Sequence, residues 1–153
     1  MSEATNSGPC YNSCFDNIVD EKRRVQIPSN WRKGQNETEF MLILWPSASQ
    51  KDACLMVLPP QAADKLRDRI TAMPFGDSQA EALRRFLGKK SHMVTLDKSG
   101  RITLPEHMAK AVGIDKKAVL VGMFDRFQIW NPERYEETRA AVDALAPDAF
   151  SQL

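Results

Sequence analysis

DEKRRVQIP at residues 20–28 and DKSGRITLP at residues 97–105 are two copies of one pattern. Each copy contains an aspartate, three residues, an arginine, a β-branched residue, a polar residue, an aliphatic residue and a proline. A second echo follows in the same order, with LMVLPP at 55–60 against FQIWNP at 127–132. Because two patterns recur in the same order, we interpret the chain as an internal duplication.

Each half is expected to contain short strands followed by a long helix. Alternation of apolar and polar residues predicts strands, and the proline or glycine that borders each segment predicts where helices begin and end. In the second half the pattern predicts strands at 92–96, 101–104, 118–123 and 126–130, with helices at 105–112 and from Pro132 to Leu145. In the first half it predicts strands at 25–27, 40–44 and 53–58 and a helix over 60–73.

A further helix over 78–87 is expected to connect the halves. Ser78 and Glu81 have the spacing of a capping box, and Gly88 is the expected stop. On the helix that follows Pro132, one apolar stripe is expected from Tyr135, Thr138, Val142 and Leu145.

The composition is that of an ordinary globular protein. The chain has 153 residues, of which 42% are hydrophobic and 27% are charged, and this excludes wholesale disorder. Its 21 basic and 20 acidic residues leave a net charge of +1, so a nucleic-acid function must come from the local placement of charge. The longest apolar run, 40–45, is too short to span a membrane. We therefore expect a cytoplasmic protein without a membrane partner.

Neither a metal site nor catalytic chemistry is indicated. Cys10, Cys14 and Cys54 give an odd cysteine count, and His92 and His107 stand alone, so four zinc ligands are not in place. The familiar catalytic motifs are missing, and we expect no catalytic residue, no cofactor and no small-molecule substrate. A small enzyme with His107 as a base is the least favoured alternative.

The duplicated turn has a chemical reason to carry aspartate and arginine. A carboxylate four residues before an arginine can hold the guanidinium in place across a tight turn, and Gly100 permits a positive φ there. Exposed cations at the tips suit a phosphate backbone or guanine edges. The predicted DNA-binding residues are Lys22, Arg23, Arg24, Lys98 and Arg101. The predicted turn-supporting residues are Asp20, Asp97 and Gly100. The alternative is that each pair merely stabilises its turn.

These residues resemble the MraZ family over roughly residues 13–146. DKSGRITLP and the later FDRFQIWNPERYEE are similar to the family's pattern, whose hallmark is the duplicated turn with aspartate and arginine four apart. The first copy keeps Asp20, Arg24 and Pro28 but has Arg23 where the pattern usually has glycine. Because an arginine at positive φ is strained, we expect strain in the first turn.

The resemblance implies an α+β fold, a duplicated AbrB/MazE/MraZ-like double-split (swapped-hairpin) β-barrel with flanking helices. Both halves of the barrel would come from one chain. The expected organisation is a flexible arm at 1–12, a first repeat at 13–76, a connecting helix and basic segment at 77–91, and a second repeat at 92–153.

The resemblance also implies a sequence-specific transcriptional regulator. Such a protein would bind direct repeats in promoter DNA, repress the division and cell-wall gene cluster, associate with the nucleoid and form a ring-shaped homo-oligomer. Large apolar residues that one small core does not readily hide support assembly: Trp31, Trp45, Phe75, Phe86 and Phe150. The helices at 60–73, 78–87 and 132–145 are the expected interfaces. An antitoxin-like binding module is the alternative, and the lack of a long disordered tail after the last helix argues against it.

Overall fold

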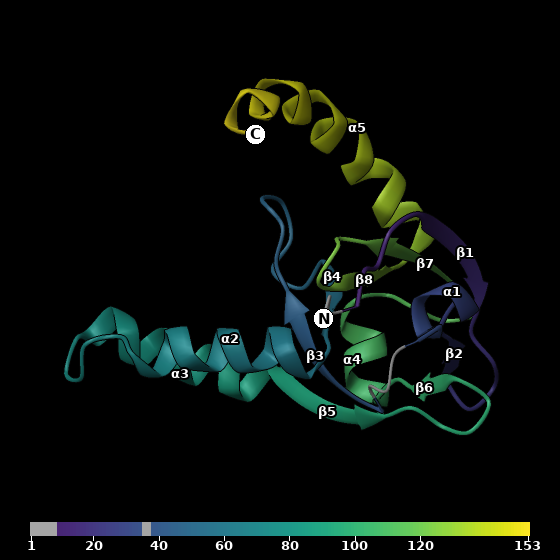
Figure 1. Ribbon diagram of the computed structural model, residues 1–153, viewed down its shortest axis with the longest axis horizontal. Coiled ribbons are helices and arrows are strands. Elements are labelled where there is room, and N and C mark those ends of the chain that lie inside the picture. Colours follow the sequence, from purple (N-terminus) through teal and green to yellow (C-terminus); the bar gives the residue numbers. More distant parts are fainter. Residues whose placement is uncertain (1–8, 35–37) are drawn as a thin grey trace, which may run out of the picture.

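The protein is an α+β molecule built on antiparallel strands (Figure 1). The computed structural model describes residues 9–34 and 38–153. The first half forms β1 (Cys14–Ile18), β2 (Arg24–Gln26), α1 (Ser29–Arg32), β3 (Glu39–Trp45), β4 (Cys54–Leu58) and α2 (Pro60–Thr71). The connecting helix is α3 (Ser78–Lys90). The second half forms β5 (Ser91–Thr95), β6 (Arg101–Thr103), α4 (Glu106–Ala111), β7 (Lys117–Gly122), β8 (Phe127–Trp130), α5 (Pro132–Ala149) and a 3-10 turn (Phe150–Gln152).

The two halves are interleaved. The large sheet has the order β1-β7-β8-β4-β3-β5, so β1 of the first half pairs with β7 of the second, and β5 of the second pairs with β3 of the first. The small sheet is a ribbon of β2 and β6, one strand from each half. Neither half can therefore complete its pairing alone.

An approximate twofold axis relates the halves. Val25 pairs with Ile102 at the centre of the ribbon, and these two residues occupy the same position in the repeated pattern. In the large sheet Met56 pairs with Gln128, which are likewise equivalent in the second echo. Residues that are equivalent in the two sequence patterns are thus cross-strand partners in both sheets.

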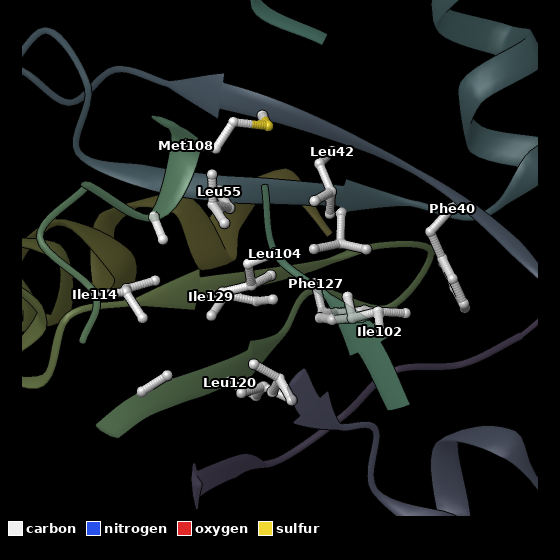
Figure 2. Close-up of a cluster of buried hydrophobic side chains, with 14 of the residues drawn as sticks. Phe40, Leu42, Leu55, Ile102, Leu104, Met108, Ile114, Leu120, Phe127 and Ile129 are labelled. Atoms are coloured by element: carbon white, nitrogen blue, oxygen red, sulfur yellow. The ribbon is translucent and has the colours of Figure 1, made fainter. Parts of the chain in front are cut away.

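One apolar core receives side chains from both halves (Figure 2). The inner face of the ribbon contributes Val25 and Ile27 from one strand segment and Ile102 and Leu104 from the other, all fully buried. Strand β4 is buried along its whole length because it lies in the middle of the sheet. The alternation predicted for the two turn-following strands is confirmed by this burial.

The helices are covered to very different degrees. Helix α2 buries Ala62 and Ala63 against β3 and β4, and α3 packs beside α2. Helix α5 buries no residue in the single chain, and Figure 1 shows it leaving the sheet towards the C-terminus. Among the described residues, no helix is long and apolar enough to cross a membrane.

Helix α3 begins at Ser78 as predicted, but its predicted capping residue and its predicted C-terminal end are wrong. Its N-cap is Asp77, whose side chain accepts a hydrogen bond from the amide of Gln79, and not Ser78. The helix also continues through Gly88 to Lys90. Gly88 has a helical backbone with open space around it, so nothing at this position forces the chain out of the helix.

Two aromatic residues are more buried than the sequence predicted. Trp31 is 2% exposed and packs edge-on against Tyr11 and Phe15, while its indole N–H donates to the carbonyl of Asn12. Trp31 is therefore a core residue and is not available to an interface. Tyr11, assigned to the flexible arm at 1–12, is also buried, and its backbone pairs with Phe124. Residues 1–8 of that arm lie outside the described residues.

Candidate nucleic-acid interface

The first turn, residues 20–24, is organised by the carboxylate of Asp20. Its Oδ1 accepts hydrogen bonds from the backbone amides of Lys22, at 2.9 Å, and Arg24, at 2.8 Å. Its Oδ2 accepts from the Nε of Arg24 at 2.6 Å. The amide of Arg23 also donates to the carbonyl of Asp20, which closes the turn. One side chain thus fixes both the backbone and the following guanidinium.

The second turn, residues 97–101, repeats each of these bonds. Oδ1 of Asp97 accepts from the amides of Ser99 and Arg101, at 2.8 and 2.9 Å. Oδ2 accepts from the Nε of Arg101 at 3.1 Å, and the amide of Gly100 donates to the carbonyl of Asp97. The same set of hydrogen bonds is therefore present in both turns, with Arg23 in the first and Gly100 in the second at the equivalent position.

These bonds favour the ionised form of both carboxyl groups. The backbone hydrogen bond from Arg24 is the main cause that holds the pKa of Asp20 below its ordinary value. The backbone hydrogen bond from Arg101 does the same for the pKa of Asp97. Both aspartates therefore carry a full negative charge at neutral pH, and each leaves the terminal nitrogens of its arginine for another partner.

The ribbon places the two arginines on one face. Arg24 pairs with Thr103 and Gln26 pairs with Arg101, and cross-strand partners project to the same side. Val25 and Ile102 project to the opposite side, into the core. Strand rise and strand spacing put the Cα atoms of Arg24 and Arg101 about 8 Å apart. The outer face is therefore polar, and Arg24 and Arg101 lie at the two ends of one diagonal across it.

The exposed turn tips add unequal charges. Lys22 and Lys98 are both exposed, but they do not occupy equivalent positions, since Lys98 corresponds to Glu21 and Lys22 corresponds to Ser99. The five predicted cations do lie in the two turns that flank the ribbon, at its opposite ends.

Arg23 takes the conformation that its position demands. Its φ is +62°, against +81° for Gly100, so the first turn has the same left-handed residue as the second. The Nε of Arg23 donates to the carbonyl of Leu104, across the ribbon, at 3.0 Å. The expected strain is therefore present, and it is accompanied by a hydrogen bond that a glycine could not make.

Other cations near the repeat in sequence are used elsewhere. Lys90 forms an ion pair with Asp52 at 3.1 Å, and a terminal nitrogen of Arg84 donates to the carbonyl of Met73. Arg84 also lies over the ring of Phe75. Lys90 is thus tied to the β3–β4 loop and Arg84 to the segment after α2, so neither cation extends the charged face of the ribbon.

One cation at the ribbon was not predicted. Arg32, at the end of α1, lies against Gly100 in the second turn, and its Nε donates to the carbonyl of Ile27 at 2.9 Å. Arg32 is distant from Gly100 in the sequence. The one sequence feature that could have identified Arg32 as a cation at the ribbon is its position one helical turn after Pro28. In the part of the chain that the structure describes, no cluster of three metal-ligating side chains is found.

An interleaved, duplicated α+β fold with two aspartate-anchored basic turns defines a class of binding protein in which both halves build one surface. The family profile described as "MraZ protein, putative antitoxin-like" matches residues 89–148. The Transcriptional regulator MraZ of Caulobacter vibrioides (strain NA1000 / CB15N) is 32% identical over 141 residues, which cover 92% of this chain and 89% of the relative.

Other relatives carry the same name. The Transcriptional regulator MraZ of Ruegeria sp. (strain TM1040) is 31% identical, with 88% of this chain and 87% of the relative covered. That of Roseiflexus sp. (strain RS-1) is 28% identical, with 86% and 88% covered. The chain belongs to the MraZ family, which is a family of transcriptional regulators and not of enzymes.

Proposed function

We propose that this protein is a sequence-specific DNA-binding transcriptional regulator that contacts DNA through the two turns. The observation that carries the proposal is the identical bonding of Asp20 to Arg24 and of Asp97 to Arg101, at the two ends of one ribbon. Both arginine side chains are 30% exposed, so each guanidinium is held by its aspartate and still accessible. The relatives named as transcriptional regulators support the same function.

The outer face of the ribbon suits duplex DNA. The major groove is wide enough for a two-stranded β-ribbon, and arginine is the side chain that most often recognises guanine. Arg24 and Arg101 are the proposed base-reading or phosphate-clamping groups, and Lys22, Arg23 and Lys98 the supporting phosphate contacts. The approximate twofold axis through Val25 and Ile102 makes the two turns face the DNA in related orientations.

We also propose the fold family implied by the sequence, a duplicated double-split (swapped-hairpin) barrel. The exchange of β1 and β5 between halves and the β2–β6 ribbon support it. The proposed organisation keeps a first repeat at 13–76, a connecting segment at 77–91 and a second repeat at 92–153.

We also propose that the protein assembles into a ring-shaped homo-oligomer. Helix α5 has no buried residue, and its predicted stripe leaves Val142 and Leu145 more than half exposed. Phe75, at the end of the α2–α3 hairpin, is almost fully exposed, and Phe150 also faces solvent. A ring would cover these residues and repeat the basic ribbon at regular spacing, which suits short direct repeats in a promoter. Light scattering coupled to size exclusion tests the assembly, and a stable monomer that binds its operator tightly would contradict it.

The function is tested by binding of the full chain to the DNA upstream of its own gene. Fluorescence anisotropy with that duplex and with a random duplex, at stated salt concentrations, gives the specificity ratio. We expect the promoter duplex to bind at least a thousandfold more tightly, which is about the lower limit for specific regulators. Equal affinity for the two duplexes would refute the proposed function. A reporter gene under the same promoter then distinguishes repression from activation.

A further inference from the structure

Arg32 and Arg23 each donate a hydrogen bond to a backbone carbonyl, at opposite ends of the ribbon. Arg32 Nε donates to the carbonyl of Ile27, and Arg23 Nε donates to the carbonyl of Leu104, at 2.9 and 3.0 Å. Ile27 and Leu104 are equivalent residues of the duplicated pattern, each following its turn and its strand. Two guanidinium groups are therefore placed symmetrically although Arg32 and Arg23 are not equivalent in sequence.

The neighbouring small residues explain this exchange. The offset that relates Asp20 to Asp97 relates Arg23 to Gly100 and Arg32 to Ala109. A Cβ added to Gly100 would collide with the guanidinium of Arg32, so that group occupies the space a side chain at position 100 would need. At the other end Arg23 and the small Ala109 line the same surface hollow. Each end thus has one arginine and one small residue, with their positions exchanged.

Both groups can be reached by a ligand. Arg23 and Arg32 are each partly exposed, and Arg32 lines an open hollow with Ser29, Asn30 and Lys33. Within residues 9–34 and 38–153, the terminal guanidinium nitrogens of Arg23 and Arg32 form no hydrogen bond or ion pair, although the charge of Arg23 contributes to the lowered pKa of Glu106 in the same hollow. Arg32 lies directly against the residue before Arg101. A fixed cation with unused donors beside each Asp–Arg turn is suited to a phosphate oxygen.

We propose that Arg32 is a further DNA-binding residue, and that it supplies to the second turn, from helix α1 of the first half, the phosphate-contacting guanidinium that Arg23 supplies to the first. This inference rests on the proposed DNA-binding function. It raises the number of arginines at the ribbon to two at each end, Arg23 with Arg24 and Arg32 with Arg101. The second turn therefore depends on a residue of the other half of the chain.

The test is a salt titration of DNA binding with the full chain and the duplex upstream of its own gene. Arg32→Ala should weaken binding roughly tenfold, as expected when a charge-assisted hydrogen bond is lost. It should also make the slope of log K against log salt shallower by about 0.9 for each engaged turn. Arg23→Ala should change both quantities by a similar amount. Arg32→Lys should restore most of the salt slope because it keeps the charge.

Two controls separate binding from structure and from total charge. Lys89→Ala removes an exposed cation from α3 and should leave the slope unchanged. The unfolding free energy of each variant shows whether the fold has been lost, and Arg32→Gln keeps a donor for Ile27 without the charge. A merely structural Arg32 would lower stability in Arg32→Ala while Arg32→Gln kept the wild-type salt slope, and that result would overturn the inference.

The exchanged positions of arginine and small residue can be tested directly by moving the arginine of the first turn from position 23 to position 109. Arg23→Gly combined with Ala109→Arg would give the first turn the arrangement of the second, and it should recover the salt slope lost in Arg23→Gly alone. A wild-type chain that does not prefer its promoter would defeat the proposed function and this inference together. Promoter binding that depends on Arg24 and Arg101 but is indifferent to Arg32 would defeat this inference alone.

Discussion

The turn at 20–24 and the turn at 97–101 have the same hydrogen bonds but different residues at the left-handed position. Arg23 has φ +62° and Gly100 has φ +81°, and the amides around them reach equivalent acceptors. A left-handed conformation costs an L-residue roughly 1–2 kcal/mol, which glycine avoids. The comparison shows that the anchoring aspartate, and not glycine, is what the two turns share.

The packed neighbour decides which residue each turn can accept. At the second turn the space beside Gly100 is filled by the guanidinium of Arg32, so a larger residue there would have to displace that side chain as well as adopt a positive φ. At the first turn Arg23 and Ala109 line one surface hollow, and the side chain of Arg23 reaches across the ribbon to the carbonyl of Leu104.

The largest effect is expected at the shared arginines. Arg24→Ala and Arg101→Ala should each weaken promoter binding by about 1–3 kcal/mol per engaged turn if the side chain reads a base. Because their bonding is the same, the two variants should lose similar amounts, measured by anisotropy at one salt concentration. Arg126→Ala is the matched control, since Arg126 also pairs with an aspartate, Asp125, and is 29% exposed but lies outside the ribbon. A double variant of Arg24 and Arg101 with unchanged affinity would remove the turns from the mechanism.

The next effect concerns the glycine of the second turn, Gly100. Gly100→Ala should lower the free energy of unfolding by about 1–2 kcal/mol, because alanine at this φ is strained, and it should also displace Arg32. In an Arg32→Ala background the cost should be smaller, and urea denaturation of the four chains of the double-mutant cycle measures the difference.

Gly88 supplies the control for that cycle. It is helical and has open space around it, so Gly88→Ala should raise stability by roughly 0.5–1 kcal/mol. Equal costs of Gly100→Ala with and without Arg32 would show that the guanidinium does not occupy the space beside the turn.

A smaller effect is expected for the opposite change. Arg23→Gly removes the left-handed strain but also removes the hydrogen bond to Leu104, which is worth about 0.5–1.5 kcal/mol. The two changes oppose each other, so the unfolding free energy should stay within about 1 kcal/mol of the wild type. Urea denaturation checks this, and a loss as large as that of Gly100→Ala would mean that the two turns are not alternative solutions of one geometry.

The sequence predicted what is local and missed what is tertiary. The repeated pattern was sufficient to place both ribbon strands, because burial of Val25 and Ile102 follows from alternation. It could not identify Arg32, whose role depends on α1 of one half lying against a turn of the other. Trp31 was expected at an interface for a similar reason, since the cluster of Tyr11 and Phe15 that buries it is assembled only in the fold. The C-terminal end of α3 was missed because a glycine ends a helix only where it adopts the left-handed conformation, and Gly88 stays helical.

The smallest effect is a pH dependence that compares the two aspartates. The pKa values of Asp20 and Asp97 are lowered in the folded state, first by the backbone amides of Arg24 and Arg101. A group with a lowered folded pKa stabilises the protein above its unfolded pKa, and this stabilisation is lost as the pH falls through the folded value. The unfolding free energy should therefore decline below about pH 4, the ordinary range of an aspartate.

Urea midpoints between about pH 6 and pH 2 should fall less steeply for Asp20→Asn and Asp97→Asn than for the wild type. Glu106 and Asp125, whose pKa values are also lowered, are unchanged in both variants, so the difference isolates the turns. Since the Asp20–Arg24 distance is 2.6 Å and the Asp97–Arg101 distance is 3.1 Å, Asp20→Asn should flatten the curve more. Curves parallel to that of the wild type would show that neither carboxylate senses its turn in the folded state.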